Sequence, residues 1–440
     1  MKIEGIERRD MGERSRTVAR VTWEDCDRPA EEIYFETEQE FADGLAPGAE
    51  PFLVAGLVPA FRHGERRIAV EGEVCPVLRA NLNTAMHVLS YWYRLPERAI
   101  PIESGGCRAA APASPRRAAF YYSGGVDSLT TLRLNRLAIP DSHPQSFKDG
   151  LLICGLEVEA TSAFDIVRDS LSTLARASGI RLVPVFTNVR LLDDCWRAWE
   201  KMTEGALLAS VAHAVGRRIS SASLASSFDI SDLAPNGTHP VLDPCYSSYG
   251  VQIIHDGIDL PRLDKVRVLA EWDLGLRHLR VCNNSAEYRE GQPNCGSCEK
   301  CLRTLLELLI VGAMDKAEGF RNKTVTEELI REKVRMSWQI VGLWRDLIEP
   351  LEQLGRHDLA RAIRWHFRHL FGETGWRGRL RRFDRRKLNG VLFFLKQALW
   401  PGPRALPEHF FWPHSGRDAS DAELREVLFK YRLVKEKFDC

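Results

Sequence analysis

Two groups of residues in this 440-residue chain combine types and spacings that could perform chemistry. Residues 123–128 read Ser-Gly-Gly-Val-Asp-Ser, and residues 282–301 contain four cysteines. Glycines let a ligand approach the main chain closely, and the free amides at the start of a helix favour an anion. Thiolates are common ligands of structural zinc. The sequence therefore predicts an anion site and a metal site.

The glycine segment follows an apolar run, residues 118–122, and opens an amphipathic run that ends near residue 138. Ligands of open α/β sheets bind beyond the carboxyl ends of the strands, where this segment would lie. Asp127 would repel a phosphate, so we expect it to orient the loop or to help hold a divalent cation. The lysine of the Walker pattern is absent, and the alternative is a tight turn with capping serines. The residues expected to bind a nucleotide are Ser123, Gly124, Gly125, Val126, Asp127 and Ser128.

The cysteine segment places three cysteines at two-residue intervals after a fourth one upstream. Four thiolates form a complete tetrahedral set, which leaves no open position on a zinc ion, so the zinc would be structural. An iron–sulfur cluster and a redox-active or sulfur-carrying cysteine pair are the alternatives. The expected ligands are Cys282, Cys295, Cys298 and Cys301.

Strand-like and helix-like segments alternate between residues 119 and 227. Such alternation predicts an α/β fold with a parallel, doubly wound sheet. Residues 235–300 are expected to be rich in loops, and Arg262 and Lys265 would share a helical face that could grip phosphates or a carboxylate. Polar residues after the fourth strand would line a substrate pocket, and the alternative for each is ordinary turn and capping chemistry. These candidates are Ser226, His239, Asp243, His255 and Asp256.

The composition bounds the remaining classes of function. The formal net charge is only +1, so the chain as a whole has no electrostatic attraction to nucleic acid or to a membrane surface. The basic run at 376–387 is expected to be a solvated helix face, and the alternative is a surface that binds an RNA or an acidic protein partner. The first residues lack the apolar core of a secretory signal, and no apolar run is long enough to span a bilayer. We therefore expect a cytoplasmic protein.

The pattern of segments divides the chain into three expected regions. Residues 1–115 would form an N-terminal mixed α/β domain, and residues 103–118, rich in Gly, Pro, Ala and Ser, would link it to the rest. Residues 116–312 would form the nucleotide-binding domain with the zinc site. Residues 313–440 would form a C-terminal helical domain.

The string Ser-Gly-Gly-Val-Asp-Ser resembles the PP-loop motif of the ATP pyrophosphatase superfamily, because it contains the residues of that motif in the same order. Like the motif, it is expected to follow a strand and to open a helix. Together with the cysteine cluster, residues 118–310 resemble 7-cyano-7-deazaguanine synthase. The gap of twelve residues between Cys282 and Cys295 is longer than in that family, and the chain carries added terminal regions. These additions resemble a branch found in bacterial antiphage systems, whose members are associated with attaching a deazaguanine to a protein.

The resemblance implies a PP-loop (HUP-like) fold, ATP, Mg²⁺ and Zn²⁺ as cofactors, and adenylation of 7-carboxy-7-deazaguanine with release of pyrophosphate. An amine donor, such as ammonia or a protein N-terminus, would then displace AMP. Asp127, Ser128, Arg262 and Lys265 would serve catalysis, and the strand end at Gly155 would meet the adenine. A tRNA-modifying enzyme and a nucleotide-binding regulator without turnover are the alternatives. Partners would be the deazapurine acid and the amine, with a protein partner and a homodimer left open and nucleic acid not expected.

Overall fold

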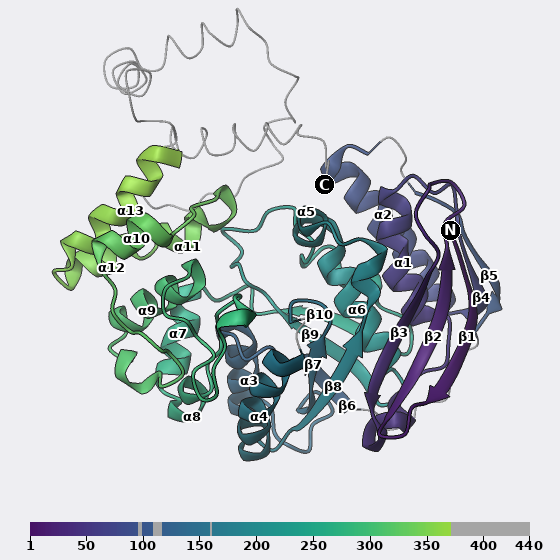
Figure 1. The fold of residues 1–440 in the computed structure, drawn as a ribbon, viewed down its shortest axis with the longest axis horizontal. Helices are drawn as coiled ribbons and strands as arrows, with labels where there is room; N and C mark the ends of the chain where they lie inside the picture. The colour runs from purple at the N-terminus through teal and green to yellow at the C-terminus, as the bar shows by residue number, and fades with distance from the viewer. Residues whose placement is uncertain (96–98, 109–116, 159–160, 371–440) are drawn as a thin grey trace, which may run out of the picture. The chain divides into compact units, whose positions relative to one another are not determined.

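The computed structural model describes residues 1–95, 99–108, 117–158 and 161–370 (Figure 1). The chain forms two compact units. The first comprises Met1–Cys295 and Asp315–Arg321, and the second comprises Gly296–Met314 and the residues from Asn322 onward. Residues 371–440, including the basic run at 376–387, lie outside the described part.

One 10-stranded sheet runs through the first unit in the order β10-β9-β6-β7-β8-β3-β2-β1-β4-β5. Its pairs are parallel from β10 to β8 and from β1 to β5, and antiparallel from β8 through β3 and β2 to β1. The predicted α/β class is therefore confirmed, with a mostly parallel sheet. The strands are β1 (Lys2–Asp10), β2 (Arg14–Thr22), β3 (Glu31–Glu38), β4 (Ile68–Val74), β5 (Ile102–Cys107), β6 (Arg117–Tyr121), β7 (Phe147–Cys154), β8 (Arg181–Thr187), β9 (Ile219–Ala225) and β10 (Gln252–Asp256).

The helices of the first unit connect these strands and cover the sheet (Figure 1). Helix α1 is buried almost throughout because it is apolar on all sides. Among the described helices, none has the length and apolar composition of a membrane span. The helices are α1 (Glu50–Arg62), α2 (Pro76–Tyr93), α3 (Val126–Ala138), α4 (Thr161–Ala177), α5 (Trp196–Ala198), α6 (Glu204–Ala214), α7 (Arg262–Ala270) and α8 (Asp273–Arg277), with short turns η1 (Gln39–Gly44), η2 (Val189–Leu192), η4 (Asp243–Tyr246) and η5 (Ser285–Glu287) and a π-helical turn η3 (Trp199–Thr203).

The five strands β6 to β10 have the spatial order third, second, first, fourth, fifth when they are counted along the chain. This order reverses direction between β6 and β9, which makes that pair a topological switch point. Helices cover both faces of this part of the sheet: Tyr121 donates a hydrogen bond to Leu208 O in α6, whereas the next residue, Tyr122, donates to Leu171 O in α4. Consecutive residues of an extended strand point to opposite faces, so α4 and α6 lie on opposite sides.

Strand β10 lies in the region that the sequence predicts to be rich in loops. Its five residues, Gln-Ile-Ile-His-Asp, pair in parallel with β9 and make β10 one of the two edge strands of the sheet. Because the segment begins and ends with a polar residue, its short apolar centre does not show the sequence pattern of a strand. The strand matters for function because it brings His255 and Asp256 to the carboxyl edge of the sheet.

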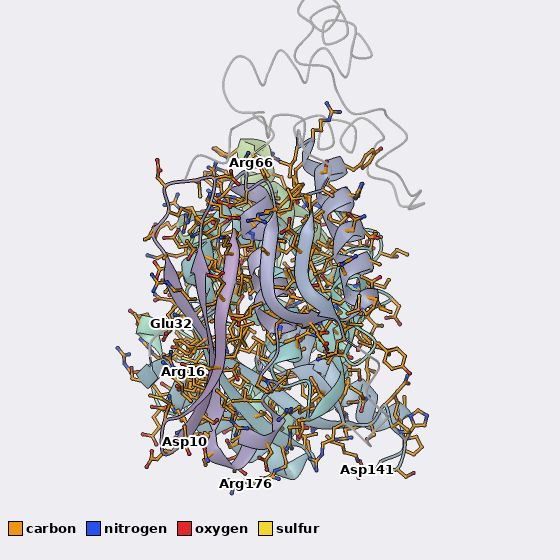
Figure 2. All side chains as sticks on the ribbon, turned by 90° about the vertical axis from the view of Figure 1, so that its right-hand side faces the viewer. Asp10, Arg16, Glu32, Arg66, Asp141 and Arg176 are labelled. Carbon is orange, nitrogen blue, oxygen red and sulfur yellow. The ribbon has the colours of Figure 1, made fainter. Side chains whose placement is uncertain are left out.

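The N-terminal strands expose a charged face, on which Figure 2 labels Arg16 and Glu32. Arg16 on β2 lies 2.8 Å from the carboxylate of Glu36 on β3, and Arg9 on β1 lies 2.9 Å from Glu32. The Arg16–Glu36 pair joins the neighbouring strands β2 and β3, whereas the Arg9–Glu32 pair reaches across β2 from β1 to β3.

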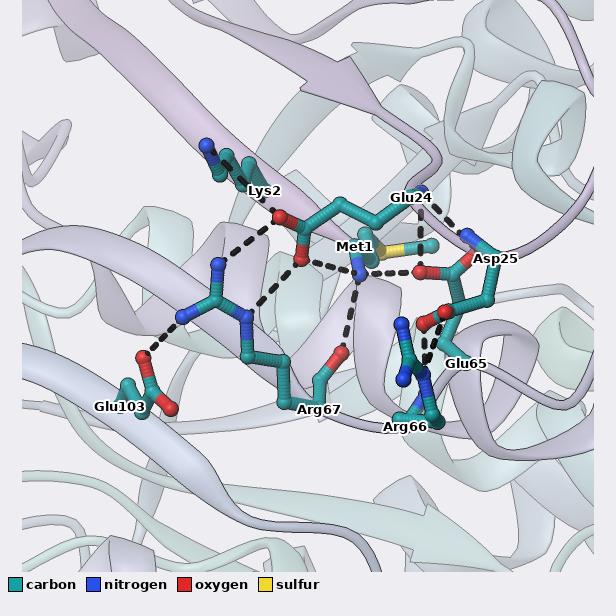
Figure 3. A network of polar contacts seen from close by, with 8 residues as sticks. All are labelled: Met1, Lys2, Glu24, Asp25, Glu65, Arg66, Arg67 and Glu103. Carbon is teal, nitrogen blue, oxygen red and sulfur yellow. Dashed lines mark hydrogen bonds and ion pairs between the residues drawn. The ribbon is translucent and has the colours of Figure 1, made fainter.

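A network at the start of β1 attaches that strand to the loop before β4 (Figure 3). The buried amine of Met1 donates hydrogen bonds to the buried carboxylate of Glu65 and, at 2.9 Å, to Arg67 O. Glu24 accepts hydrogen bonds from the Arg67 guanidinium at 2.8 and 3.1 Å. The hydrogen bond from Arg67 lowers the pKa of Glu24 to about 2.

The described part of the second unit is helical. Helix α9 buries one apolar stripe, and Trp344 is fully buried and donates to Glu299 Oε1 at 2.8 Å. The expected division at residues 115 and 312 stays a prediction. The helices of this unit are α9 (Glu299–Ile310), α10 (Glu327–Lys333), α11 (Val341–Arg345), α12 (Ile348–Gln353) and α13 (His357–Leu370), with the short turn η7 (Trp338–Ile340).

Candidate functional site

The glycine segment forms the connection from β6 to α3. Gly124 has φ +76°, and a Cβ there would approach a methyl group of Leu171 to 3.0 Å. Gly125 is the N-cap residue of α3, whose first helical residue is Val126. The loop therefore ends at a helix N-terminus beside the switch point, as the sequence predicts for an anion site.

The two serines of the loop bond to each other and to the main chain. Ser123 Oγ lies 3.1 Å from Ser128 Oγ, which in turn lies 3.2 Å from the carbonyl oxygen of Gly125. Gly125 N donates to Ser123 Oγ at 3.3 Å. These contacts are those of the alternative interpretation, a serine-capped turn. A phosphate contact would require the hydroxyls to rotate away from these partners.

Asp127 lies between two cations supplied by α7. Its carboxylate oxygens are 2.8 Å from an Arg262 guanidinium nitrogen and 3.4 Å from Lys265 Nζ. Lys265 is buried and also donates to Ser226 O, at the end of β9. Helices α3 and α7 are joined further by a hydrogen bond of 3.2 Å from Thr130 Oγ1 to Lys265 O. The structure thus brings together residues that are far apart in the sequence and were predicted to serve catalysis.

Arg280, which the sequence did not single out, holds the loop from behind. Its backbone N–H donates to Gly124 O at 2.8 Å, and its guanidinium Nε donates to Ser123 O at 2.9 Å. A second guanidinium nitrogen donates to the hydroxyl of Tyr288 at 2.8 Å. Its position two residues before Cys282 is the only signal in the sequence, and nothing in that spacing predicts a bond to Ser123, 157 residues earlier.

The four predicted cysteines come together in one cluster. Their sulfur atoms all lie within 4.8 Å of one another, and Cys282 and Cys301 are buried. Four convergent thiols are a donor set that suits a tetrahedral zinc ion, so the residues fit the predicted metal. Gly296, with φ +76°, allows the turn between the second and third cysteines, because a Cβ there would lie 2.1 Å from Asn322 O.

Helix α9 and Asn294 position the ligands of this cluster. Cys298 is the N-cap residue of α9, and Cys301 lies in its first turn, where the helix dipole favours a thiolate. The fully buried Asn294 accepts hydrogen bonds from Val281 N at 2.7 Å and Cys282 N at 3.2 Å. Its amide group also donates to Leu279 O and Gly319 O, at 2.7 and 3.2 Å. Sequence reasoning missed Asn294, whose partners are all main-chain atoms.

The five predicted substrate residues divide between the two faces of the sheet. Asp256 interacts with Thr131 of α3 and with Lys265, so it belongs to the face that carries Asp127. Ser226 lies at the same edge, and its N–H donates to Asp256 O at 2.7 Å. Burial raises the pKa of the Asp256 carboxyl group.

The other three substrate candidates lie on the opposite face. His255 precedes Asp256 on β10, and its Nδ1 lies 2.7 Å from Asp243 Oδ2. The remaining buried atoms of this pair, His255 Nε2 and Asp243 Oδ1, have no hydrogen-bond partner among the described residues. Burial raises the pKa of Asp243, and burial lowers the pKa of His239 to about 4. The His239 ring lies 4.8 Å from that of Trp92.

Gly155 lies directly after β7, with φ +105°. A Cβ on this residue would lie 1.8 Å from Thr187 O, so the close approach of two strand ends already requires a glycine. Its N–H donates to Val158 O at 2.8 Å. The predicted contact with adenine stays a prediction.

No known family model matches the chain, and neither a curated protein nor a solved structure shows significant similarity to it. The site combines a glycine loop at a helix N-terminus, two cations beside it, and a four-cysteine centre. Such a combination could hold a polyphosphate and stabilise the negative charge that develops when it departs.

Proposed function

We propose that this chain is an ATP-dependent adenylating enzyme of the PP-loop superfamily, similar to 7-cyano-7-deazaguanine synthase. One observation carries the proposal: the loop at 123–128 follows β6 at the switch point, with Arg262 and Lys265 beside it. Doubly wound sheets bind nucleotides at such points. The acid to be activated would be 7-carboxy-7-deazaguanine, and the products of this step would be an acyl adenylate and pyrophosphate.

The roles of the loop residues follow from the charge that adenylation develops. When the acid oxygen attacks the α phosphate, negative charge accumulates on the departing pyrophosphate, and Arg262 and Lys265 would stabilise it. Asp127 would hold both cations in place, which suits its two ion pairs better than a role as the main ligand of Mg²⁺. Mg²⁺ bound with the nucleotide would neutralise further phosphate charge.

In the second step an amine would attack the acyl carbon, forming the C–N bond and releasing one proton to solvent, while AMP leaves with the electrons of the broken C–O bond. The acceptor would be ammonia, or a protein N-terminus if the chain serves antiphage defence. His255 and Asp243, at the carboxyl edge of β10, are candidates for contacts with the acid or the amine. The zinc centre would be structural, because its four protein ligands leave no open position.

The test is ATP–pyrophosphate exchange and AMP release with 7-carboxy-7-deazaguanine and ammonia. Asp127→Asn should lower both by about 100-fold or more, because the two cations lose the carboxylate that orients them. Asp141→Asn is the matched control, since Asp141 is an exposed loop carboxylate that also pairs with a lysine, and it should leave turnover unchanged. Normal turnover in Asp127→Asn would refute the proposal. Nucleotide binding without AMP release would instead favour a regulatory module.

A further inference from the structure

A continuous set of hydrogen bonds joins the cysteine centre to the glycine loop. The Tyr288 hydroxyl donates to Cys282 O at 2.6 Å and accepts from Arg280 at 2.8 Å. The same Arg280 guanidinium donates from Nε to Ser123 O at 2.9 Å, and the backbone N–H of Arg280 donates to Gly124 O at 2.8 Å. Arg280 and Tyr288 are both buried, so water competes little for these bonds.

The bonds from Arg280 fix the direction of two peptide planes in the loop. In a trans peptide the C=O and N–H bonds point in opposite directions. With the carbonyls of Ser123 and Gly124 turned toward Arg280, the N–H groups of Gly124 and Gly125 point away from it. Gly124 N–H has no acceptor among the described residues. Gly124 N–H would receive an anion at the start of α3 directly, and Gly125 N–H would do so once it releases Ser123 Oγ.

The other end of the path is fixed by the cysteine centre. Cys282 O accepts the Tyr288 hydroxyl, and Cys282 N bonds to Asn294, so the main chain of this ligand is held on both sides. A metal bond to Cys282 Sγ would restrain the same residue further. Loss of the metal would remove this additional restraint from Cys282, whose carbonyl orients Tyr288 and, through it, Arg280.

We infer that Arg280 is a positioning residue that couples metal occupancy of the cysteine centre to the affinity of loop 123–128 for pyrophosphate. The inference rests on the proposed function in one respect, which is that the loop binds pyrophosphate. The coupling is reciprocal: zinc strengthens pyrophosphate binding, and pyrophosphate strengthens zinc binding by the same factor. Site-to-site couplings of this kind commonly amount to about 5- to 150-fold in affinity.

The experiment titrates inorganic pyrophosphate into the full chain, with zinc loaded and after removal of zinc by a chelator. Calorimetry should give an affinity at least about fivefold weaker without zinc. Tyr288→Phe, loaded with zinc, should bind pyrophosphate with nearly the weaker affinity of the zinc-free protein, because the path is cut while all four thiols remain. Tyr93→Phe is the matched control: it also removes a hydroxyl bonded to a carbonyl, that of Lys201, and it should bind like the wild type.

If the chain unfolds when zinc is removed, the coupling can be measured in the other direction, as the effect of pyrophosphate on zinc affinity. Competition with a chromophoric chelator should show tighter zinc binding in saturating pyrophosphate for the wild type, and a smaller gain for Tyr288→Phe. Equal pyrophosphate affinity in zinc-loaded wild type and Tyr288→Phe would overturn the coupling and leave the proposed function intact. Absence of pyrophosphate binding to the zinc-loaded wild type would overturn the assignment of the loop itself.

Discussion

Replacing Asn294 with alanine should damage the cysteine centre more than the size of the substitution suggests. The side chain is fully buried and makes four hydrogen bonds to main-chain atoms around Cys282. Its removal leaves the N–H groups of Val281 and Cys282 and the carbonyl of Leu279 without partners in a buried site, whereas Gly319 O keeps its bond from the main-chain N–H of residue 294. Each unsatisfied group costs about 1 kcal/mol or more, so the expected loss in the free energy of unfolding is about 3–4 kcal/mol.

The substitution should also weaken zinc binding, because groups behind metal ligands commonly contribute about 10- to 100-fold to metal affinity. Urea denaturation of the zinc-loaded chain measures the first effect, and competition with a chromophoric chelator measures the second. Asn188→Ala is the control, since Asn188 makes two such bonds, to Tyr34 and Glu32, away from the cysteines. It should cost about 1–2 kcal/mol and leave zinc affinity unchanged. A loss below about 1 kcal/mol in Asn294→Ala, or an unchanged zinc affinity, would refute the reasoning.

Two further predictions concern the first unit. Gly155→Ala should lower the free energy of unfolding by about 3 kcal/mol, because the new Cβ would lie 1.8 Å from Thr187 O. Gly179→Ala, with open space around it, should lower it by only about 1 kcal/mol. Equal losses in denaturation experiments would contradict the steric argument. Glu24 has a folded-state pKa of about 2 against an ordinary value of 4.5, so its contribution to stability is full above about pH 4.5 and disappears as the pH falls toward 2. The stability difference between wild type and Glu24→Gln should therefore shrink over that interval, and a difference that is constant with pH would show that the ion pair does not contribute.

The sequence predicted those features whose conformation is determined by residues close together in the chain. The glycine loop, the cysteine spacing and the strand–helix alternation depend on neighbouring residues, and each forms where it was expected. Strand β10 was missed because only two of its five residues are apolar, too few for a recognisable strand pattern, and because the strand that it pairs with, β9, lies about 30 residues earlier. Short strands of this kind take their stability from pairing, which no local pattern reveals.

The residues that organise the site were harder to recognise than those that would perform its chemistry. Arg280, Tyr288 and Asn294 act on carbonyl and amide groups of the main chain, which every residue possesses. The types of the partner residues therefore give no sign in the sequence that these contacts exist. The separation of His255 from Asp256 onto opposite faces follows from strand geometry, but only once β10 is recognised as a strand.

The junction between β3 and β8 has a consequence for attempts to shorten the chain. Strand β8 pairs with β3 through Phe35, Glu36 and Thr37, and Thr37 donates from its hydroxyl to Pro184 O at 2.7 Å. A chain trimmed to begin at residue 116 would leave this side of β8 as a bare edge, with main-chain groups available to any passing strand. By pairing with β8, the N-terminal strands thus prevent other chains from pairing with this edge.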